Sequence, residues 1–409
     1  MKIHLKSLNY SPELTGIGKY NGEMLTWFAE QGDEVSALCA PPYYPEWKVH
    51  SGFSGKRFAT SVENGVSVTR CPIYVPAQPT TVKRLIHLAS FAFSSSMALF
   101  GRFFKKPDVV LVVEPTLFCV PSVLLFCKLT GAKAVLHIQD YEVDAMFGLG
   151  MAGKAGFLSK FAFSVERWLM RRFDAVSTIS YSMMAKAKEK GVDPSRLVFF
   201  PNWSDTSFVH PDVDGSNLRK AWGVDESQKV VLYAGNIGAK QGLELVMEAA
   251  SRYISRPEVK FFMVGSGAYV DELKRMVVDR NLTNVEFKPL QAWEDVPAML
   301  AMADVHLVVQ RKGAADAVLP SKLTNILSVG GNAVITAEAN TELGRLVDEY
   351  PGIYTAVEPE DVNAFCTGLD LEFAKSGVNH VARDYAEKNL NKEAILSRFR
   401  DDLKNLIDS

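Results

Sequence analysis

The chain begins each of its halves in the same way, with an apolar strand that leads through a glycine-rich loop into an amphipathic helix. The first copy starts at Lys2 and the second at Lys229. The loops hold Gly16 and Gly18 in the first copy and Gly235, Gly238 and Gly242 in the second. Glycine lets a backbone turn sharply and approach a ligand closely, and the N–H groups at a helix start attract anions. The repeat predicts two α/β domains that face each other across a cleft holding a phosphate-bearing substrate.

Length and composition favour a globular protein of several domains in a reducing compartment, the cytoplasm. The chain has 409 residues, 47% hydrophobic and 22% charged, enough for two or three domains with filled cores. Its net charge of −2 gives no overall field that would attract nucleic acid, so no nucleic-acid partner is expected. The five cysteines show no CxxC spacing, which argues against a disulfide framework or a zinc site.

Strand-like runs alternate with helix-like runs along both halves, which is typical of parallel sheets covered on both faces. We predict an N-terminal domain over residues 1–205, a polar linker over 206–228 and a second domain over 229–390. Residues 391–409 are expected to form a helix that packs back toward the N-terminal domain. The expected strands are residues 2–8, 34–40, 66–74, 108–114, 133–139, 174–180 and 197–202, then 229–235, 259–265, 285–290, 304–310, 332–337 and 352–357.

Two other segments of the first half attract attention. Residues 40–65 are rich in proline and aromatic residues and follow a strand, and loops of this length are often functional. Residues 83–106 hold several phenylalanines bracketed by basic side chains. They fit either a helix lying in a membrane interface or a core helix with basic ends. The aromatic residues are Phe91, Phe93, Phe100, Phe103 and Phe104, and the basic ones are Lys83, Arg84, Arg102, Lys105 and Lys106.

Two common phosphate-binding motifs are absent from the glycine loops. A dinucleotide-binding fingerprint would show GxGxxG and an acidic residue ~20 positions later, whereas Gly16 and Gly18 follow a longer loop and the next strand ends without such an acid. No GK[ST] occurs, so the chain lacks a P-loop of the Walker type.

Four runs of the second half have a more specific order and spacing: YAGNIGAKQGLE, FFMVGSG, DVHLVV and VLPSKLTNILSVGGNAVI. They resemble the donor half of glycosyltransferase family 4, and the resemblance extends over essentially the whole chain. It implies the GT-B fold, in which two Rossmann-like, doubly wound parallel-sheet domains face a central cleft. The runs NIGAKQGLE, RKGAADAVLPSKL and HIQDYEVDA look like the bacterial exopolysaccharide branch, in particular the colanic acid biosynthesis glycosyltransferases of fucosyltransferase type.

The resemblance also implies the residues that bind the donor. They are Gly16, Gly18, Gly235, Asn236, Gly238, Lys240, Gly265, Gly267, Asp316, Ser321, Lys322 and Asn325. The chain departs from the family pattern, because Asn236 stands where an arginine is frequent and Lys240 lies one place early. Ala317 and Asn325 replace the paired glutamates. Lys240 and Lys322 could each instead be an ordinary surface residue.

In the acceptor half, family members often carry a histidine just after the strand that here spans residues 133–139. Gln139 occupies that position, and Asp140 and His137 lie beside it. Asp140 is the first choice for a catalytic polar group and His137 the second, although His137 could equally be a core histidine. Glu142 and Asp144 are interpreted as solvated loop acids.

The resemblance implies a retaining hexosyltransferase that moves a sugar, for this branch fucose from GDP-fucose, to a polyprenyl-diphosphate-linked oligosaccharide. That acceptor places the protein peripherally at the inner face of the cytoplasmic membrane. No metal or other cofactor is expected, and the DVD sequence at Asp212 is interpreted as part of a loop. The alternatives are another donor, UDP- or dTDP-linked, for O-antigen or capsule, a non-hydrolysing epimerase of UDP-sugars, and a non-catalytic scaffold of a polysaccharide assembly.

Overall fold

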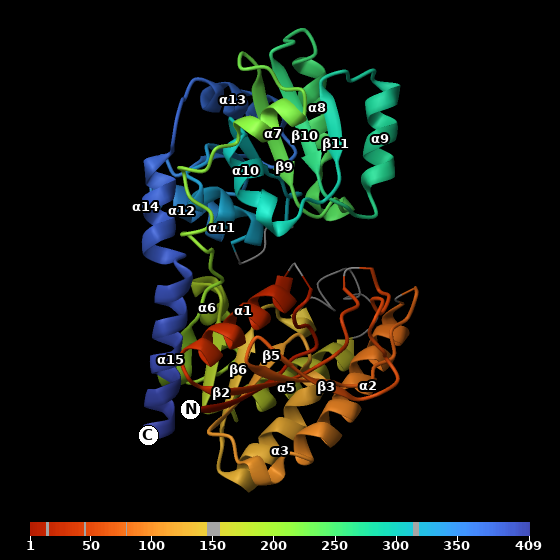
Figure 1. Cartoon of the computed structure of the whole chain (residues 1–409), viewed down its shortest axis with the longest axis vertical. Coiled ribbons are helices and arrows are strands. Elements are labelled where there is room, and N and C mark those ends of the chain that lie inside the picture. Colours follow the sequence, from red (N-terminus) through yellow and green to blue (C-terminus); the bar gives the residue numbers. More distant parts are fainter. Residues whose placement is uncertain (14–15, 45, 79, 145–155, 314–318) are drawn as a thin grey trace. The chain divides into compact units, whose positions relative to one another are not determined.

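The structure, a computed structural model, describes residues 1–13, 16–44, 46–78, 80–144, 156–313 and 319–409. The chain divides into two compact units. The first unit comprises residues 1–201 and 396–409, and the second comprises residues 202–395. The segment 206–228 therefore lies inside the second unit, and the last helix passes from the second unit to the first (Figure 1).

The first unit is built on an eight-stranded sheet in the order β3-β4-β2-β1-β5-β6-β7-β8. All neighbouring pairs are parallel except β3 and β4. The strands are β1 (Lys2–Lys6), β2 (Glu34–Cys39), β3 (Ala59–Glu63), β4 (Val66–Arg70), β5 (Val109–Glu114), β6 (Lys133–Ile138), β7 (Ala175–Thr178) and β8 (Leu197–Phe199). The chain leaves β1 first toward β2 and later toward β5, so the strand order reverses between β1 and β5.

Strand β3 lies in the stretch that the sequence predicts as loop, and it pairs with β4 as a hairpin. Its turn holds Asn64 and Gly65 with φ angles of 49° and 79°. An Asn-Gly pair suits a tight hairpin turn because both residues tolerate positive φ. The local signal for β3 was therefore present in the sequence.

The helices that the structure describes in the first unit alternate with its strands. They are α1 (Gly16–Glu30), α2 (Thr81–Phe100), η1 (Phe103–Lys105), η2 (Leu117–Cys119), α3 (Val120–Thr130), α5 (Gly156–Met170), α6 (Tyr181–Glu189) and η4 (Pro194–Arg196). Thr80 and Ser180 cap α2 and α6, since their side chains accept hydrogen bonds from the backbone N–H of Lys83 and Met183. Helix α3 packs on β5 and β6, and α1 packs on β2.

Helix α15 (Lys392–Asp408) completes the first unit with its later turns. Phe399 is buried and stacks on Phe200, with a centroid separation of 3.7 Å, and on Phe28 at 6.5 Å. Arg400 binds Asp33 through its Nε at 2.6 Å. An aromatic cluster and one ion pair therefore hold the end of the chain on the first unit.

The second unit is built on a six-stranded parallel sheet in the order β11-β10-β9-β12-β13-β14. The strands are β9 (Lys229–Ala234), β10 (Val259–Val264), β11 (Val285–Lys288), β12 (Val305–Val308), β13 (Ala333–Thr336) and β14 (Thr355–Val357). All six coincide with runs that the sequence predicts as strands. Here the strand order reverses between β9 and β12.

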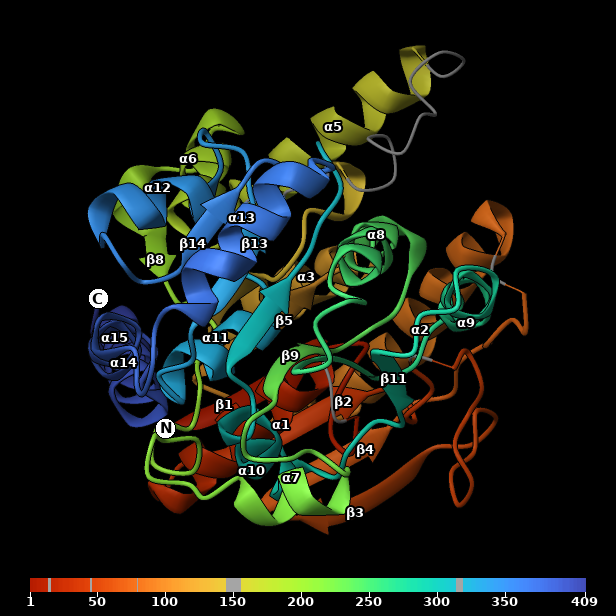
Figure 2. The same cartoon turned by 90° about the horizontal axis from the view of Figure 1, so that it is seen from above.

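Alternation along the strands of the second unit buries both faces of its sheet. Val230 and Leu232 point into one core, and Val231 and Tyr233 point into the other. Helices α10, α11, α12 and α14 cover the first face, and α8, α9 and α13 cover the second, as Figure 2 shows for several of them. The helices are α7 (Ser216–Ala221), η5 (Ala239–Gln241), α8 (Glu244–Arg252), α9 (Val270–Asp279), η6 (Trp293–Asp295), α10 (Val296–Ala301), α11 (Ser321–Ser328), α12 (Glu342–Glu349), α13 (Val362–Phe373) and α14 (His380–Asn389).

Helix α2 combines the two alternatives that its sequence left open. Phe91 and Leu99 are fully buried, whereas Phe93 is 72% exposed and Met97 is 57% exposed. Arg102 turns inward and donates to Thr69 Oγ1 at 2.7 Å. One face therefore belongs to the core and the other lies open. Among the helices that the structure describes, none is long and apolar enough to cross a bilayer.

Candidate functional site

Two glycine loops cross each other at the carboxyl edge of the second sheet. One follows β9 from Gly235 and the other follows β10 from Gly265. Gly235 donates its N–H to the carbonyl of Val264 at 2.9 Å, and Ile237 donates to the carbonyl of Ser266 at 2.8 Å. The loops therefore form one hydrogen-bonded unit beside the β9/β12 reversal, the place where open α/β sheets bind ligands.

Glycine is required where the loops cross. A Cβ on Gly265 would overlap the carbonyl oxygen of Gly235, and a Cβ on Gly267 would overlap that of Ile237. Both glycines also have positive φ, 143° and 155°, which L side chains rarely adopt. Gly265 and Gly267 thus have a packing role, and their contact with a donor stays a prediction.

Lys322 of α11 lies against the first of these loops. Its ammonium is 2.9 Å from the hydroxyl of Tyr233 and 4.0 Å from the centre of that ring. A Cβ on Gly235 would come within 3.2 Å of the ammonium nitrogen, so glycine leaves room for the lysine. The Tyr233 hydroxyl in turn donates to the carbonyl of Asn236 at 2.6 Å.

The charge of Lys322 has no carboxylate partner among the residues that the structure describes. Part of the side chain stays accessible, but burial of its ammonium lowers the pKa from 10.5 to about 7. Desolvation disfavours the charged form, and an anion placed beside it would restore that form. Binding of an anionic ligand beside Gly235 by Lys322 stays a prediction.

The other predicted donor residues of this edge are accessible. Asn236, Lys240 and Ser321 are exposed, and the Lys240 side chain forms no ion pair with the described residues. The N–H of Gly238 donates to the side chain of Gln241 at 3.1 Å. The structure therefore brings Gly235, Asn236 and Lys322 together, while Lys240 stands on the short η5 turn of the same loop.

Arg311, just after β12, was not singled out in the sequence. Its Nε donates to the carbonyl of Ala239 at 2.8 Å, and its Nη2 contacts Glu244 at 2.6 Å. Glu244 also accepts from the Tyr269 hydroxyl at 2.6 Å. Arg311 therefore supports the loop that carries Lys240 from the end of the neighbouring strand β12. This contact could be found only from the order of strands in the sheet, in which β12 lies beside β9.

Only part of the altered glutamate motif lies within the described residues. Asp316 and Ala317 lie outside the described residues. The Asn325 carbonyl oxygen accepts a hydrogen bond from the Ser204 hydroxyl at 2.8 Å, so this oxygen already has a partner within the unit. A ribose contact from Asn325 would fall to its amide nitrogen, and this role stays a prediction.

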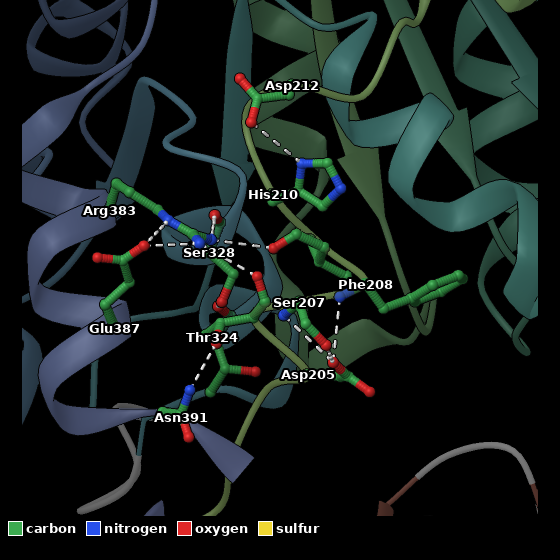
Figure 3. Close-up of polar contacts among 12 residues, drawn as sticks. Asp205, Ser207, Phe208, His210, Asp212, Thr324, Ser328, Arg383, Glu387 and Asn391 are labelled. Carbon is green, nitrogen blue, oxygen red and sulfur yellow. Dashed lines mark hydrogen bonds and ion pairs between the residues drawn. The ribbon is translucent and has the colours of Figure 1, made fainter. Parts of the chain in front are cut away.

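Helix α11 is anchored at its far end by Arg383 of α14, shown in Figure 3. The Arg383 guanidinium donates to the carbonyl of Ser328 at 2.6 Å and to those of Val209 and Thr206 at 3.2 and 3.1 Å. One side chain thus joins α14, the end of α11 and the segment that opens the unit. This anchoring fixes the helix that carries Lys322.

The DVD sequence lies in the same opening segment. Asp212 is 95% exposed at its side chain and lies 3.7 Å from His210 (Figure 3). Asp214 accepts the N–H of Ser216 at the start of α7, at 2.8 Å. Over the described ranges, no three His, Cys, Asp or Glu side chains gather in a way that could hold a metal ion.

Gly18 in the first unit also has a packing role. A Cβ on Gly18 would lie 2.7 Å from the Glu13 side chain. Glu13 is buried and accepts the N–H groups of Tyr43 and Tyr44, both at 3.2 Å. Gly16 has φ of +62° and open space around it. Whether either glycine contacts a donor stays a prediction.

The two candidate catalytic residues differ in environment. His137 is buried, with Nδ1 2.9 Å from the Ser177 hydroxyl and Nε2 2.9 Å from the Gln139 amide nitrogen. Burial lowers the pKa of His137 to about 3, so its ring is neutral near pH 7. Asp140 is exposed at the end of β6. The geometry favours Asp140 as the accessible group, and both roles stay predictions.

The interpretation of Glu142 and Asp144 as solvated loop acids is wrong. Glu142 is 7% exposed, accepts the N–H of Leu117 at 2.8 Å, and donates its own N–H to Glu114 at 3.2 Å. Burial raises the pKa of both carboxyls. Asp144 binds Lys186 and Lys190, each at 2.7 Å. These contacts could not be read from the local sequence, because the partners come from β5, η2, α6 and the C-cap of α6.

Comparison with known proteins identifies the family of the chain. Residues 15–203 match the glycosyl transferase 4-like domain, and residues 214–388 match glycosyl transferases group 1. The chain is 53% identical over 408 residues to WcaI of Escherichia coli (strain K12), provisionally named a colanic acid biosynthesis glycosyl transferase, with 99% of this chain and 100% of that protein covered.

Solved structures share the fold at low sequence identity. Sucrose-phosphate synthase from Thermosynechococcus elongatus superposes with a TM-score of 0.76 at 15% identity, covering 99% of both chains. Anabaena HepE, solved in complex with UDP, superposes with a TM-score of 0.71 at 15% identity, covering 99% of this chain and 100% of that one. The predicted GT-B fold of two parallel-sheet α/β domains is confirmed.

The crossing of the glycine loops can be tested by adding a methyl group. We expect Gly265→Ala to lower the free energy of unfolding by at least ~1 kcal/mol more than Gly223→Ala, because the new Cβ must displace the backbone of Gly235. Gly223 is the matched control, since it also has positive φ, +70°, but open space around it. Urea denaturation measures the difference, and equal shifts of the two midpoints would contradict the crossing.

Proposed function

Because the chain belongs to glycosyltransferase family 4, we propose that it is a retaining enzyme that moves a sugar from a nucleotide diphosphate to a polyprenyl-diphosphate-linked oligosaccharide. The relative WcaI supports a role in making an exopolysaccharide of the colanic acid type. By resemblance to that branch, the donor is GDP-fucose. The residues of the second unit bind the donor, and the acceptor binds at the carboxyl edge of the first sheet, near Asp140.

The observation that carries the proposal is the ammonium of Lys322 at the Gly235 turn, which has no carboxylate partner among the described residues. A nucleoside diphosphate gains negative charge as it leaves the sugar, and preorganised donors aimed at that charge lower the barrier. Lys322 provides a cation there, and the backbone N–H groups at the start of α11 lie next to it in the chain. Exposed Lys240 adds a second cation on the same loop.

A screen of nucleotide sugars tests the proposal directly. A ligand that binds the folded state raises the melting temperature, so GDP-, UDP-, dTDP- and ADP-sugars can be ranked by thermal shift. GDP-fucose is expected to give the largest shift. A larger shift with a UDP-sugar would move the donor assignment toward the type of ligand seen in HepE. No shift with any of them would favour a non-catalytic scaffold.

Lys322 and Lys240 should each contribute to donor binding. We expect Lys322→Ala and Lys240→Ala to weaken binding by roughly 1.5 to 3 kcal/mol, the range for hydrogen bonds to charged groups. Lys274→Ala, at an exposed position on α9, is the control and should bind normally. Isothermal titration measures all three, and normal binding by both site variants would refute the assignment of this site.

The lowered pKa of Lys322 adds a pH signature to the same titration. The free protein loses the Lys322 proton as the pH rises through about 7, whereas a bound diphosphate favours the charged form. Affinity should therefore fall as the pH rises from 7 to 9, and binding at pH 8 should take up close to one proton. Buffers of different ionisation enthalpy measure this uptake. Uptake that persists in Lys322→Ala would assign the proton to another group.

We also propose that transfer needs no metal ion, with Lys322 and Lys240 in place of a divalent cation at the diphosphate. Activity should then survive excess EDTA unchanged. The control is a metal-dependent glycosyltransferase assayed in the same buffer. Loss of activity that manganese or magnesium restores would contradict this mechanism and would direct attention to Asp212 and Asp214.

The lipid-linked acceptor implies that the protein works at the inner face of the membrane. Lys83, Arg84, Lys105 and Lys106 are all exposed, and a basic residue near an anionic leaflet contributes about 1 kcal/mol. We expect the wild type to pellet with anionic liposomes at low salt and less at high salt, and the variant with all four changed to Glu to stay in solution.

The control for this variant makes the same change of charge on the second unit, at the exposed residues Lys220, Lys274, Arg280 and Lys388. It should pellet like the wild type. If the control and the test variant behave alike, the stretch from Lys83 to Lys106 is not the membrane contact.

A further inference from the structure

An open groove on the first unit lies between α2 and the proline- and aromatic-rich segment after β2. Its volume is about 1080 Å³, just above the ~300–1,000 Å³ typical of small-molecule sites. The walls are mostly apolar and aromatic. They include Trp47, Phe53, Phe58, Tyr74, Phe93 and Met97.

Several of the apolar side chains that line the groove are exposed to solvent. Phe93 is 72% exposed, Met97 57% and Phe58 47%. Phe93 and Met97 are four residues apart and share one side of α2. A soluble protein rarely leaves large apolar side chains gathered around a hollow unless something binds there.

The groove is held in shape by polar contacts behind its walls. His87 of α2 is buried, with Nδ1 2.6 Å from the carbonyl of Tyr74 and Nε2 3.1 Å from the hydroxyl of Tyr43. The Trp47 ring packs on His87 at 5.2 Å, and the Tyr74 N–H donates to Ser90 at 3.0 Å. These contacts hold the residues on both sides of the groove against α2, so the groove is formed without a ligand.

Basic side chains outnumber acidic ones in the lining of the groove. Lys48 and Lys56 line it, are exposed, and form no ion pair with described residues. Residues 72–107 contain five basic residues and no acidic one. The lining includes a single acid, Glu46, which lies 3.1 Å from His50. A ligand with an apolar body and a negative end fits this arrangement.

We propose that this groove binds the hydrocarbon chain of the lipid-linked acceptor, with Lys48 and Lys56 near its phosphates. The proposal rests on the acceptor class given under Proposed function. A hydrocarbon chain has no polar group to satisfy, whereas a peptide backbone laid in apolar walls would leave N–H and C=O groups unpaired. Lys48 and Lys56, which form no ion pair with described residues, match a phosphate-bearing lipid better than the same face of a second copy, which would bring the same two lysines.

Farnesyl phosphate, used below its critical micelle concentration, is the probe. We expect titration of the full chain, followed by tryptophan fluorescence and calorimetry, to show saturable binding. Phe93→Glu should weaken this binding at least tenfold, because it places a carboxylate in the apolar wall. Val82→Glu is the matched control. It introduces the same charge on the same helix at a 66% exposed position outside the groove, and should change the affinity less than twofold.

Three results would overturn the proposal. Equal losses in Phe93→Glu and Val82→Glu would show a general effect of charge. Binding of inorganic phosphate as tight as that of farnesyl phosphate would show that the chain contributes nothing. A wild-type dimer that Phe93→Glu dissociates, seen by sedimentation, would make the groove a protein interface.

The proposed function can fail separately. In Phe93→Glu the thermal shift with the nucleotide sugar should equal that of the wild type, since Phe93 is not among the predicted donor residues. The KM for a lipid-linked acceptor should rise at least tenfold, while transfer to a water-soluble acceptor glycan should be unchanged.

If the nucleotide sugar binds normally and farnesyl phosphate does not bind the wild type, this inference is wrong and the glycosyltransferase assignment stands. If no nucleotide sugar binds while farnesyl phosphate does, the assignment fails and the groove remains a lipid site.

Discussion

Much of the second unit depends on how closely two backbone loops can approach. The carbonyls of Gly235 and Ile237 occupy the space that side chains at positions 265 and 267 would need, so the loops after β9 and β10 can cross only through glycine. That crossing fixes the turn at Gly235, and the turn leaves room for the Lys322 ammonium over the Tyr233 ring. A steric constraint on backbone atoms thereby decides where a positive charge can lie.

Lys322 shows why such a charge is useful. An ammonium that is buried against an aromatic ring without a carboxylate loses part of its preference for the charged form, and its pKa falls to about 7. A diphosphate placed at the Gly235 loop would restore the charge, which makes binding of the anion and the proton cooperative. Arg311, by contrast, is already paired with Glu244. It supports the loop and is less available to a ligand.

The first unit uses its buried polar groups differently. Glu13, His87 and Glu142 each accept or exchange hydrogen bonds with loop backbone or loop side chains, and they hold long connections against the sheet. Their shifted pKa values follow from burial and do not by themselves indicate catalysis. The same contacts shape the groove beside α2, where the apolar face of the helix stays open because the loop packs on His87 and leaves Phe93 free.

The sequence alone determined the fold class, because short apolar runs separated by helical runs leave few alternatives to two parallel sheets, and every expected strand is present. Through the resemblance to a family it also predicted Gly235 and Lys322 as donor-binding residues. The structure places the two side by side, and their role stays a prediction. The sequence misplaced Glu142 and Asp144, missed Arg311, and could not decide whether α2 was buried or open. These properties depend on which elements become neighbours: Arg311 meets Glu244 only because β12 lies beside β9, and Glu142 is buried only because β5 lies beside β6. Burial and charge pairing arise from contacts between residues far apart in the chain, and tertiary structure alone decides those.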